Sequence, residues 1–199
     1  MKMKTIIVAT QNKGKVVEIK EMLHELECEV LTMGEAGLDR EIEENGTTFE
    51  ENAIIKAEAL KAYTDAIILA DDSGLEIDYL NKEPGVYSAR YLGKDTPYAL
   101  KNQIILDKLK EVPKDKRTAR FVCAMAIAGK EIDTQVVRET IEGYISDEAR
   151  GENGFGYDPI FFVPEYNLCT AEMSSEQKNE ISHRGKALRR IKELLKGVM

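Results

Sequence analysis

Residues 66–74 read Ala-Ile-Ile-Leu-Ala-Asp-Asp-Ser-Gly, and this change from five apolar residues to two acids decides the fold. A continuous apolar run of this length is typical of a strand that is buried on both faces of a parallel sheet. The sequence predicts that the strand stops at Asp71, where Asp-Ser-Gly also suits a turn. Because ligands of open α/β sheets bind beyond the carboxyl ends of the strands, Asp71 and Asp72 are candidate functional residues.

A second buried strand is predicted over residues 5–9, followed by a polar loop and an amphipathic helix. Residues 48–51, Thr-Phe-Glu-Glu, have the form of a capping box and open another helix. Residues 120–128 and 135–145 are expected to be long strands joined by a turn. These elements predict an α/β fold with a mixed sheet and flanking helices. No linker rich in Pro, Gly or Ser interrupts them, so residues 1–199 are expected to form a single domain.

The composition argues against several classes of partner. The chain of 199 residues carries 28 Lys and Arg against 36 Asp and Glu, a net charge of −8. Such a charge repels nucleic acid phosphates and anionic lipids, so nucleic acid and membrane surfaces are disfavoured partners. The uncharged run from Phe121 to Gly129 is far shorter than the roughly 20 apolar residues of a membrane span. Three cysteines without a CxxC spacing are expected to be reduced thiols of a cytoplasmic protein.

The loop between the first strand and its helix is a candidate phosphate site, because a helix N-terminus presents unpaired N–H groups and partial positive charge. The loop consists of Thr10, Gln11, Asn12, Lys13, Gly14 and Lys15. The threonine and asparagine supply hydrogen-bonding groups, the glycine permits close backbone approach, and the lysines add charge. The loop matches neither a Walker A motif nor a GxGxxG fingerprint, and a polar turn that caps a helix is the alternative.

Two pairs of adjacent acids are candidates for a metal site. Asp71 and Asp72 repel each other at the end of a strand, a cost that a bound divalent cation would offset. Oxygen ligands beside phosphates point to Mg²⁺. Neighbouring strand residues point to opposite faces, so the spacing does not decide which aspartate reaches the metal. Glu43 and Glu44 could complete the metal shell, although they also suit a solvated acidic loop.

Three further features could bind the rest of a ligand. Asn52 and Lys56 lie one helical turn apart, where the lysine is either solvated or neutralises a phosphate. Residues 154–159, Gly-Phe-Gly-Tyr-Asp-Pro, expose an aromatic ring on which a flat ligand could stack, unless the ring only anchors a tight turn. Lys178 and residues 182–184, Ser-His-Arg, offer donors to a carbonyl-bearing ligand or are merely solvated.

Six motifs occur in order along the chain: Thr10-x-Asn12-x-x-Lys15, Thr48-Phe49-x-x-Asn52-Ala53-x-x-Lys56-Ala57, Ala70-Asp71-Asp72-Ser73-Gly74-Leu75, Pro84-Gly85-Val86-Tyr87-Ser88-Ala89-Arg90, Gly154-Phe155-Gly156-Tyr157-Asp158-Pro159, and Ala171-Glu172-Met173 with Lys178-Asn179 and Ser182-His183-Arg184. This set closely resembles the inosine triphosphate pyrophosphatase family, also called noncanonical purine NTP pyrophosphatases or Ham1-like proteins. The resemblance spans almost the whole chain, and no motif position departs from the pattern.

The resemblance implies an elongated α/β structure with two lobes around a central cleft that holds the active site. It implies a Mg²⁺-dependent homodimer that hydrolyses ITP, dITP and XTP to the monophosphate and pyrophosphate, and so removes deaminated purines from the nucleotide pool. Residues 10–15 and Lys56 would bind the triphosphate. Asp72 would be the catalytic carboxylate and a metal ligand, and Ser73 would touch the substrate. The second metal ligand would be Glu44, with Glu43 as the alternative. The residues that would hold and read the base are Phe155, Gly156, Tyr157, Asp158, Lys178, His183 and Arg184.

Two other functions compete with this one. A nucleotide pyrophosphatase of the Maf type, acting on modified or pyrimidine nucleotides, would share the broad architecture. A nucleotide sensor without catalysis could use the same pocket. The pattern of Asn12 and Lys15 with Ser182-His183-Arg184 favours the purine enzyme, and the paired acids at 71–72 beside a triphosphate favour a metal and catalysis.

Overall fold

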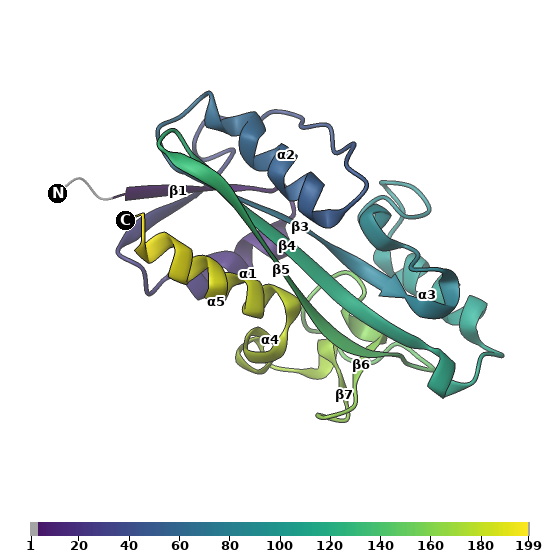
Figure 1. Cartoon of the computed structure of the whole chain (residues 1–199). Coiled ribbons are helices and arrows are strands. Elements are labelled where there is room, and N and C mark those ends of the chain that lie inside the picture. Colours follow the sequence, from purple (N-terminus) through teal and green to yellow (C-terminus); the bar gives the residue numbers. More distant parts are fainter. Residues whose placement is uncertain (1–3, 199) are drawn as a thin grey trace. The chain divides into compact units, whose positions relative to one another are not determined.

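The structure is a computed structural model that describes residues 4–198. Within these residues, seven strands form one sheet in the hydrogen-bonded order β2-β1-β3-β4-β5-β6-β7 (Figure 1). The strands are β1 (Lys4–Ala9), β2 (Cys28–Thr32), β3 (Ile67–Ile77), β4 (Thr118–Gly129), β5 (Ile132–Ile145), β6 (Phe161–Val163) and β7 (Leu168–Cys169). The helices are α1 (Lys13–Leu23), α2 (Phe49–Lys61), α3 (Tyr98–Leu109), α4 (Ser175–Ile181) and α5 (His183–Lys196). None of the helices in residues 4–198 has the length and apolar character that crossing a bilayer requires.

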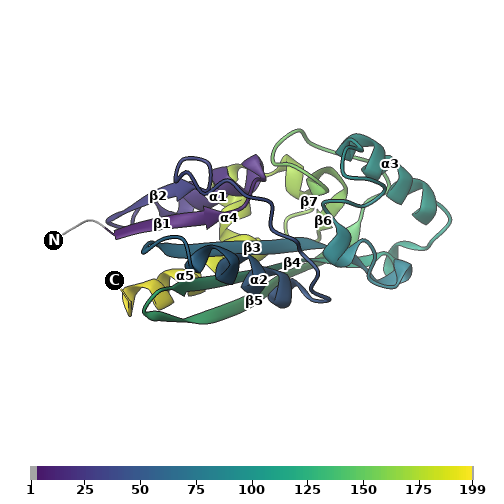
Figure 2. The same ribbon diagram turned by 90° about the horizontal axis from the view of Figure 1, so that it is seen from above.

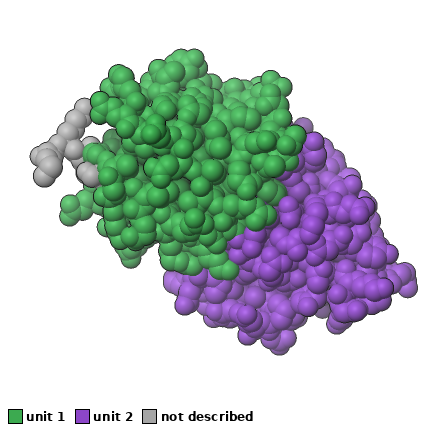
Figure 3. All heavy atoms as spheres, viewed as in Figure 1, with its two compact units in different colours: residues 1–72, 123–139, 184–199 green, residues 73–122, 140–183 purple. Residues whose placement is uncertain are grey.

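The chain divides into two compact units, which Figure 3 shows in different colours. Unit 1 contains the residues up to Asp72, residues 123–139 and the residues from Arg184 onward. Unit 2 contains residues 73–122 and 140–183. Strands β3, β4 and β5 each contribute residues to both units, and each unit has a hydrophobic core of its own.

Unit 1 contains the parallel strands of the sheet together with parts of β4 and β5, and helices cover both of its faces. Strand β1 pairs in parallel with β2 and with β3, and the β1–β3 pairing extends to Ala9 opposite Ala70. Helix α2 lies on one face and helices α1 and α5 lie on the other (Figures 1 and 2). The core on the α1 and α5 side contains every second residue of each strand: Ile6, Val8, Ile67, Leu69, Cys123, Met125 and Ile127. This alternation assigns the two faces of β3, because successive side chains of a strand point in opposite directions.

Unit 2 is built on the antiparallel part of the sheet. Strand β6 pairs antiparallel with β5 and with β7. Its core combines side chains from β3, α3, β4, β5 and β6, among them Leu75, Ile105, Phe121, Ile141 and Phe161. The Phe121 and Phe161 rings pack with their centroids 4.4 Å apart, a separation at which aromatic pairs add to the stability that burial provides.

The α/β fold with a mixed sheet and flanking helices is confirmed, as is the capping box of α2, in which Thr48 and Glu51 bond each other's backbone. The prediction that the strand stops at Asp71 is wrong, because β3 continues through both aspartates to Ile77. Both carboxylates have cationic partners inside unit 1, so the strand continues without leaving unpaired buried charges. The sequence did not predict α4, β6 or β7.

Candidate active site

The loop of residues 10–15 connects β1 to α1, as expected, and its side chains fold back on its own backbone. Asn12 is the N-cap of α1, and its side chain accepts a hydrogen bond from the Lys15 backbone N–H at 3.2 Å. The Thr10 hydroxyl accepts from the Asn12 N–H, also at 3.2 Å. Gln11 reaches away to Asp39, at 3.3 Å, and Lys13 is exposed. The loop therefore presents the N-terminus of α1 with one exposed lysine, an arrangement that suits a phosphate.

Asp71 is fully buried on the α1 and α5 face of β3. Its carboxylate pairs with Lys15 and accepts a hydrogen bond from Arg184 Nε at 3.0 Å. The thiol of Cys123 donates to the same carboxylate at 3.2 Å, and burial raises the pKa of that thiol well above its usual value. Arg184 also donates to Glu18 at 2.6 Å. Two acids and two bases thus form a balanced buried network that ties α1 and α5 to the sheet.

Asp72 points to the opposite face, toward α2. Lys56, which is 7% exposed, donates to Asp72 Oδ1 at 3.4 Å and pairs with Glu44 at 3.3 Å. One ammonium therefore holds two carboxylates together, and they come from segments far apart in sequence. Glu43, in contrast, is exposed. Of the two glutamates that the sequence left open, Glu44 is the one that shares a cation with Asp72.

The electrostatics of Asp72 differ from those of its neighbour. Its second oxygen, Oδ2, is buried and has no hydrogen-bond partner among residues 4–198. Burial raises the pKa of Asp72 above its usual value; Lys56 and Lys15 oppose this shift, and Glu44 and Asp71 add to it. A buried carboxylate oxygen without a partner is costly, and a bound cation would remove the cost.

The residues around Lys56 fit Mg²⁺. Residues 4–198 hold no group of three or more His, Cys, Asp or Glu side chains that could bind a metal ion. Mg²⁺ does not need such a group, because it is commonly held by one or two carboxylates together with waters and substrate phosphates. Asp72 and Glu44 supply two carboxylates of this kind. Ser73, which follows Asp72 in β3, is half-buried.

Unit 2 contains the glycine-rich loop that was predicted to hold a base. Gly154 and Gly156 adopt left-handed backbone angles, with φ of +72° and +68°. Between them, the Phe155 backbone N–H donates to Asp158 Oδ2 at 2.8 Å, and Lys178 Nζ donates to the same oxygen at 2.6 Å. The Lys178 ammonium also lies 5.0 Å from the centre of the Phe155 ring. The structure therefore brings the buried Asp158 and Lys178 into one cluster with the half-buried Phe155.

The remaining predicted residues have other surroundings. Tyr157 is buried and its hydroxyl donates to the Ser88 carbonyl at 2.7 Å, while burial raises its pKa. His183 is stacked on Phe121 with ring centroids 4.9 Å apart. Arg184 lies in the network around Asp71, where burial alone would lower its pKa but Asp71 and Glu18 raise it above the usual value.

Several residues that hold these clusters were not predicted from the sequence. Glu18 lies one helical turn after Lys15, and that spacing could have indicated a role beside the lysine. Asn102 in α3 donates to the Gly156 carbonyl at 3.1 Å, and the Tyr98 ring meets Tyr157 edge to face. No local signal reveals these two contacts, because the partners are more than fifty residues apart.

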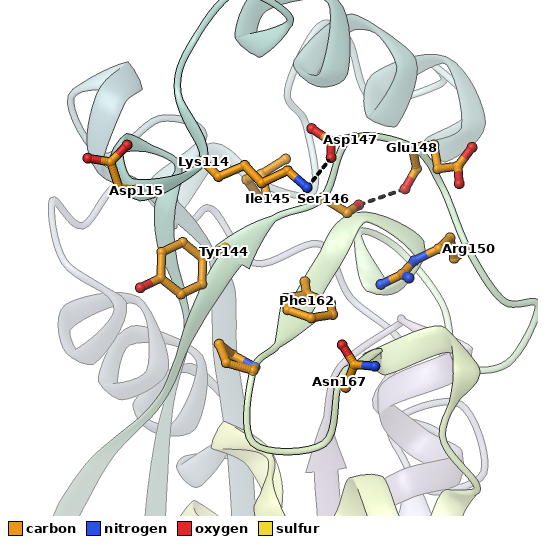
Figure 4. A pocket seen from close by; sticks show the side chains of 11 residues that line it. Lys114, Asp115, Tyr144, Ile145, Ser146, Asp147, Glu148, Arg150, Phe162 and Asn167 are labelled. Atoms are coloured by element: carbon orange, nitrogen blue, oxygen red, sulfur yellow. Dashed lines mark hydrogen bonds and ion pairs between the residues drawn. The ribbon is translucent and has the colours of Figure 1, made fainter.

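Unit 2 also contains a cavity of about 500 Å³ that includes none of the predicted residues (Figure 4). Lys114, Tyr144, Asp147, Arg150 and Phe162 are among its lining residues. Two of its charged residues, Lys114 and Asp147, form an ion pair at 2.8 Å. This lysine and its aspartate partner are largely exposed, unlike the buried Lys56 and Asp72.

The fold and these clusters define an α/β protein with a carboxylate–lysine centre where a parallel strand pair ends. A sequence model of the Ham1 family matches residues 6–194. The dITP/XTP pyrophosphatase of Bacillus cereus is 50% identical over 193 residues, which cover 96% of this chain and 94% of that protein. The dITP/XTP pyrophosphatase of Bacillus subtilis is 49% identical, with 97% and 98% covered. The Ham1 protein of Staphylococcus aureus has a solved structure that matches with a TM-score of 0.87 and 41% identity, covering 98% of this chain and all of that one. The chain belongs to the Ham1 family, as its six motifs predicted.

Proposed function

We propose that this protein is a Mg²⁺-dependent pyrophosphatase of noncanonical purine nucleoside triphosphates. It hydrolyses ITP, dITP and XTP to the nucleoside monophosphate and pyrophosphate, and thereby removes deaminated purines from the nucleotide pool. Relatives that are about half identical over nearly the whole chain have the name dITP/XTP pyrophosphatase. The observation that carries the proposal is the meeting of Asp72 and Glu44 at the buried ammonium of Lys56.

In this proposal the carboxylates of Asp72 and Glu44 hold Mg²⁺. The bound ion would neutralise charge on the phosphate oxygens and on the departing pyrophosphate, which is a dominant contribution in phosphoryl transfer. The unpartnered Oδ2 of Asp72 supports this assignment. Glu43 is exposed and is not needed for the site.

The chain's own residues carry the chemical step. Asp72 orients a water and accepts its proton as the water oxygen attacks the α-phosphorus. The new bond forms from water to the α-phosphorus, the bond from that phosphorus to the α,β-bridging oxygen breaks, and pyrophosphate leaves. Lys15, Lys56 and the N-terminus of α1 offset the negative charge of the phosphates. A positioned general base of this kind typically contributes about 10²–10⁴-fold to the rate.

The cluster of unit 2 would select the base. Hypoxanthine and xanthine carry a carbonyl at C6, where adenine carries an amino group. Donors from Lys178 or His183 would pair with that carbonyl and face another donor in ATP. A site built around such hydrogen bonds can discriminate by about 10⁴–10⁵-fold, far more than a difference in apolar contact provides. The Phe155 ring supplies a surface on which the purine would stack.

A pyrophosphate-release assay tests this function on one preparation of the full chain. ITP, dITP, XTP, GTP, ATP and dTTP are compared at equal concentration with Mg²⁺, and again with excess EDTA. We expect rapid release from the first three nucleotides, release from ATP slower by at least about 10²-fold, and loss of all release with EDTA.

Each rival function gives a different result in this assay. Preference for dTTP, the pyrimidine nucleotide in the panel, would favour a Maf-type activity. Tight binding of ITP without pyrophosphate release would make the protein a nucleotide sensor. Equal rates on all six nucleotides would contradict the proposed base selection.

A further inference from the structure

Asn52 is a buried side chain that the proposed reaction does not use. It lies in the second turn of α2, one turn before Lys56, and is 0% exposed. Its Oδ1 accepts a hydrogen bond from the Gly46 backbone N–H at 2.8 Å. Its Nδ2 is buried and has no hydrogen-bond partner among the residues that the structure describes.

Stability alone does not explain an asparagine at this position. Asparagine is a poor helix former, and a buried amide N–H without a partner destabilises the folded state. An apolar residue would avoid that cost, but it would leave the Gly46 N–H without its acceptor. Sequences depart from helix propensity and from the pairing of buried polar groups mainly at functional sites. The side-chain hydrogen bond of Asn52 to Gly46 is therefore the feature that a functional role must explain.

Besides the ion pair of Glu44 with Lys56, two hydrogen-bonding anchors hold the acidic loop, residues 43–47, on α2, and the bond to Gly46 is the first. The second anchor is Glu51, whose carboxylate accepts from the Thr47 N–H at 2.6 Å and from the Thr47 hydroxyl at 2.8 Å. A methyl group on Gly46 would lie only 2.7 Å from Asn52 Oδ1 and 2.8 Å from Glu51 Cβ. The close fit of Gly46 against Asn52 therefore requires glycine.

This anchor acts two residues away from Glu44. The Glu44 carboxylate meets Lys56, and Lys56 meets Asp72. Asn52 and Lys56 lie on the same face of α2, so one helix face both holds the loop and receives its glutamate. If the loop moved, Glu44 would leave the carboxylate pair while Asp72 would keep its place in β3.

We propose that Asn52 is a positioning residue that fixes the acidic loop through Gly46, so that Glu44 and Asp72 form the divalent-cation site. The inference rests on the proposed function only in that the site takes Mg²⁺. Residues that orient metal ligands typically change metal affinity or activity by about 10–100-fold when they are replaced. A change of this size is expected for the loss of Asn52.

The test measures metal binding without nucleotide. Mn²⁺ alone is titrated into the full chain, and the free ion is followed by electron paramagnetic resonance. Asn52→Ala removes the anchor from the helix, and Gly46→Ala displaces it from the loop. We expect each variant to bind Mn²⁺ about 10–100-fold more weakly, and the double variant to be no weaker than either single one, since both changes break the same contact.

The second readout is the Mg²⁺ dependence of ITP hydrolysis, and the control variant is Asn45→Ala. Asn45 is an exposed asparagine next to Gly46, so its replacement should leave Mn²⁺ binding unchanged. In ITP hydrolysis, Asn52→Ala should raise the Mg²⁺ concentration for half-maximal rate and leave KM for ITP at saturating Mg²⁺ unchanged. A general folding defect would instead lower the amount of active enzyme at every Mg²⁺ concentration.

The outcomes separate this inference from the proposed function. If both variants bind Mn²⁺ as the parent does, Asn52 has no positioning role, whatever the enzyme hydrolyses. If the variants lose Mn²⁺ binding but the parent hydrolyses none of the nucleotides, the inference stands and the proposed function fails.

Discussion

Asp71 and Asp72 are neighbours in one strand, yet they face opposite sides of the sheet and different electrostatic surroundings. Asp71 is buried among Lys15, Arg184 and the Cys123 thiol, which together satisfy its carboxylate. Asp72 shares a single lysine with Glu44, and one of its oxygens is buried without a partner among the described residues. The first aspartate therefore holds structure together, and the second is the one available for a cation and a proton.

Replacing Asp72 by asparagine should remove catalysis and leave the fold intact. Asparagine has nearly the same shape but cannot accept the proton of the attacking water. We expect kcat for ITP to fall by about 10²–10⁴-fold, as measured by pyrophosphate release at saturating Mg²⁺. The circular dichroism spectrum should match that of the parent. Near-normal turnover would show that another group is the base.

The same variant should be more stable than the parent at neutral pH. The pKa of Asp72 is raised in the folded state, mainly by burial, so the folded protein holds this proton more tightly than the unfolded chain does. Stability from this group is present below the ordinary aspartate pKa and is lost as the pH rises through the folded-state pKa. Asparagine does not ionise, so the stability of Asp72→Asn does not decrease over this pH range. Urea unfolding at pH 7 should give a higher free energy of unfolding for Asp72→Asn than for the parent. At pH values below the ordinary aspartate pKa this difference should disappear. A variant less stable than the parent at pH 7 would contradict the raised pKa of Asp72.

At the scale of elements, the sequence correctly predicted the features of helices and strands that depend on interactions between neighbouring residues. The capping box at Thr48 and the apolar run of β1 depend on neighbours in sequence, and both are where the sequence placed them. The continuation of β3 was not predicted, because the partners that stabilise Asp71 there are distant in sequence; Arg184, for example, is 113 residues away. Turn chemistry favoured a stop at Asp-Ser-Gly, and tertiary ion pairs overrode it.

The candidate site shows the same limit. The sequence identified the aspartate pair, Lys56 and the glutamate pair as chemistry to be explained. It could not say which aspartate faces α2, because that depends on how the strands and helices of unit 1 pack. It also could not choose between Glu43 and Glu44, since the choice depends on how their loop packs on α2, where Glu44 pairs with Lys56 and Glu43 is exposed.

The glycine-rich loop of unit 2 offers a matched pair of substitutions. Gly154 and Gly156 both have positive φ, so alanine at either should cost about 1–2 kcal/mol of stability. At Gly156 the new methyl would meet only Tyr98 at 3.6 Å, an ordinary contact. At Gly154 it would collide with Asp158 Oδ2, the oxygen that holds Phe155 and Lys178.

Gly154→Ala should therefore weaken nucleotide binding more than Gly156→Ala. Loss of one hydrogen bond to a charged group costs about 1.5–3 kcal/mol, which corresponds to a rise in KM for ITP of at least about tenfold. Steady-state kinetics on ITP and ATP measure the effect, and the ratio of their kcat/KM values should fall in the Gly154 variant. Equal effects of the two alanines would mean that the Asp158 cluster does not read the base.

At the scale of the whole molecule, four of the seven large apolar side chains that are exposed among the described residues lie in residues 79–100 of unit 2. Tyr79, Tyr87, Leu92 and Leu100 are each about half exposed, and Leu92 also has a left-handed backbone conformation, with φ of 57°. Exposed apolar groups and backbone strain both occur preferentially where a protein meets a partner. The net charge of −8 disfavours nucleic acid and anionic membranes as that partner.

We expect the partner to be a second copy of the chain, so that sedimentation velocity gives a mass of twice 22.4 kDa. In a two-fold symmetric dimer each substitution enters the interface twice, and a buried glutamate without a partner is strongly unfavourable. Leu100→Glu should therefore shift the protein toward monomer. Tyr166→Glu, at an exposed tyrosine outside this segment, should leave the dimer intact. A parent protein that sediments as a monomer at micromolar concentration would rule out the dimer. If Tyr166→Glu alone dissociated the dimer, the interface would lie outside residues 79–100.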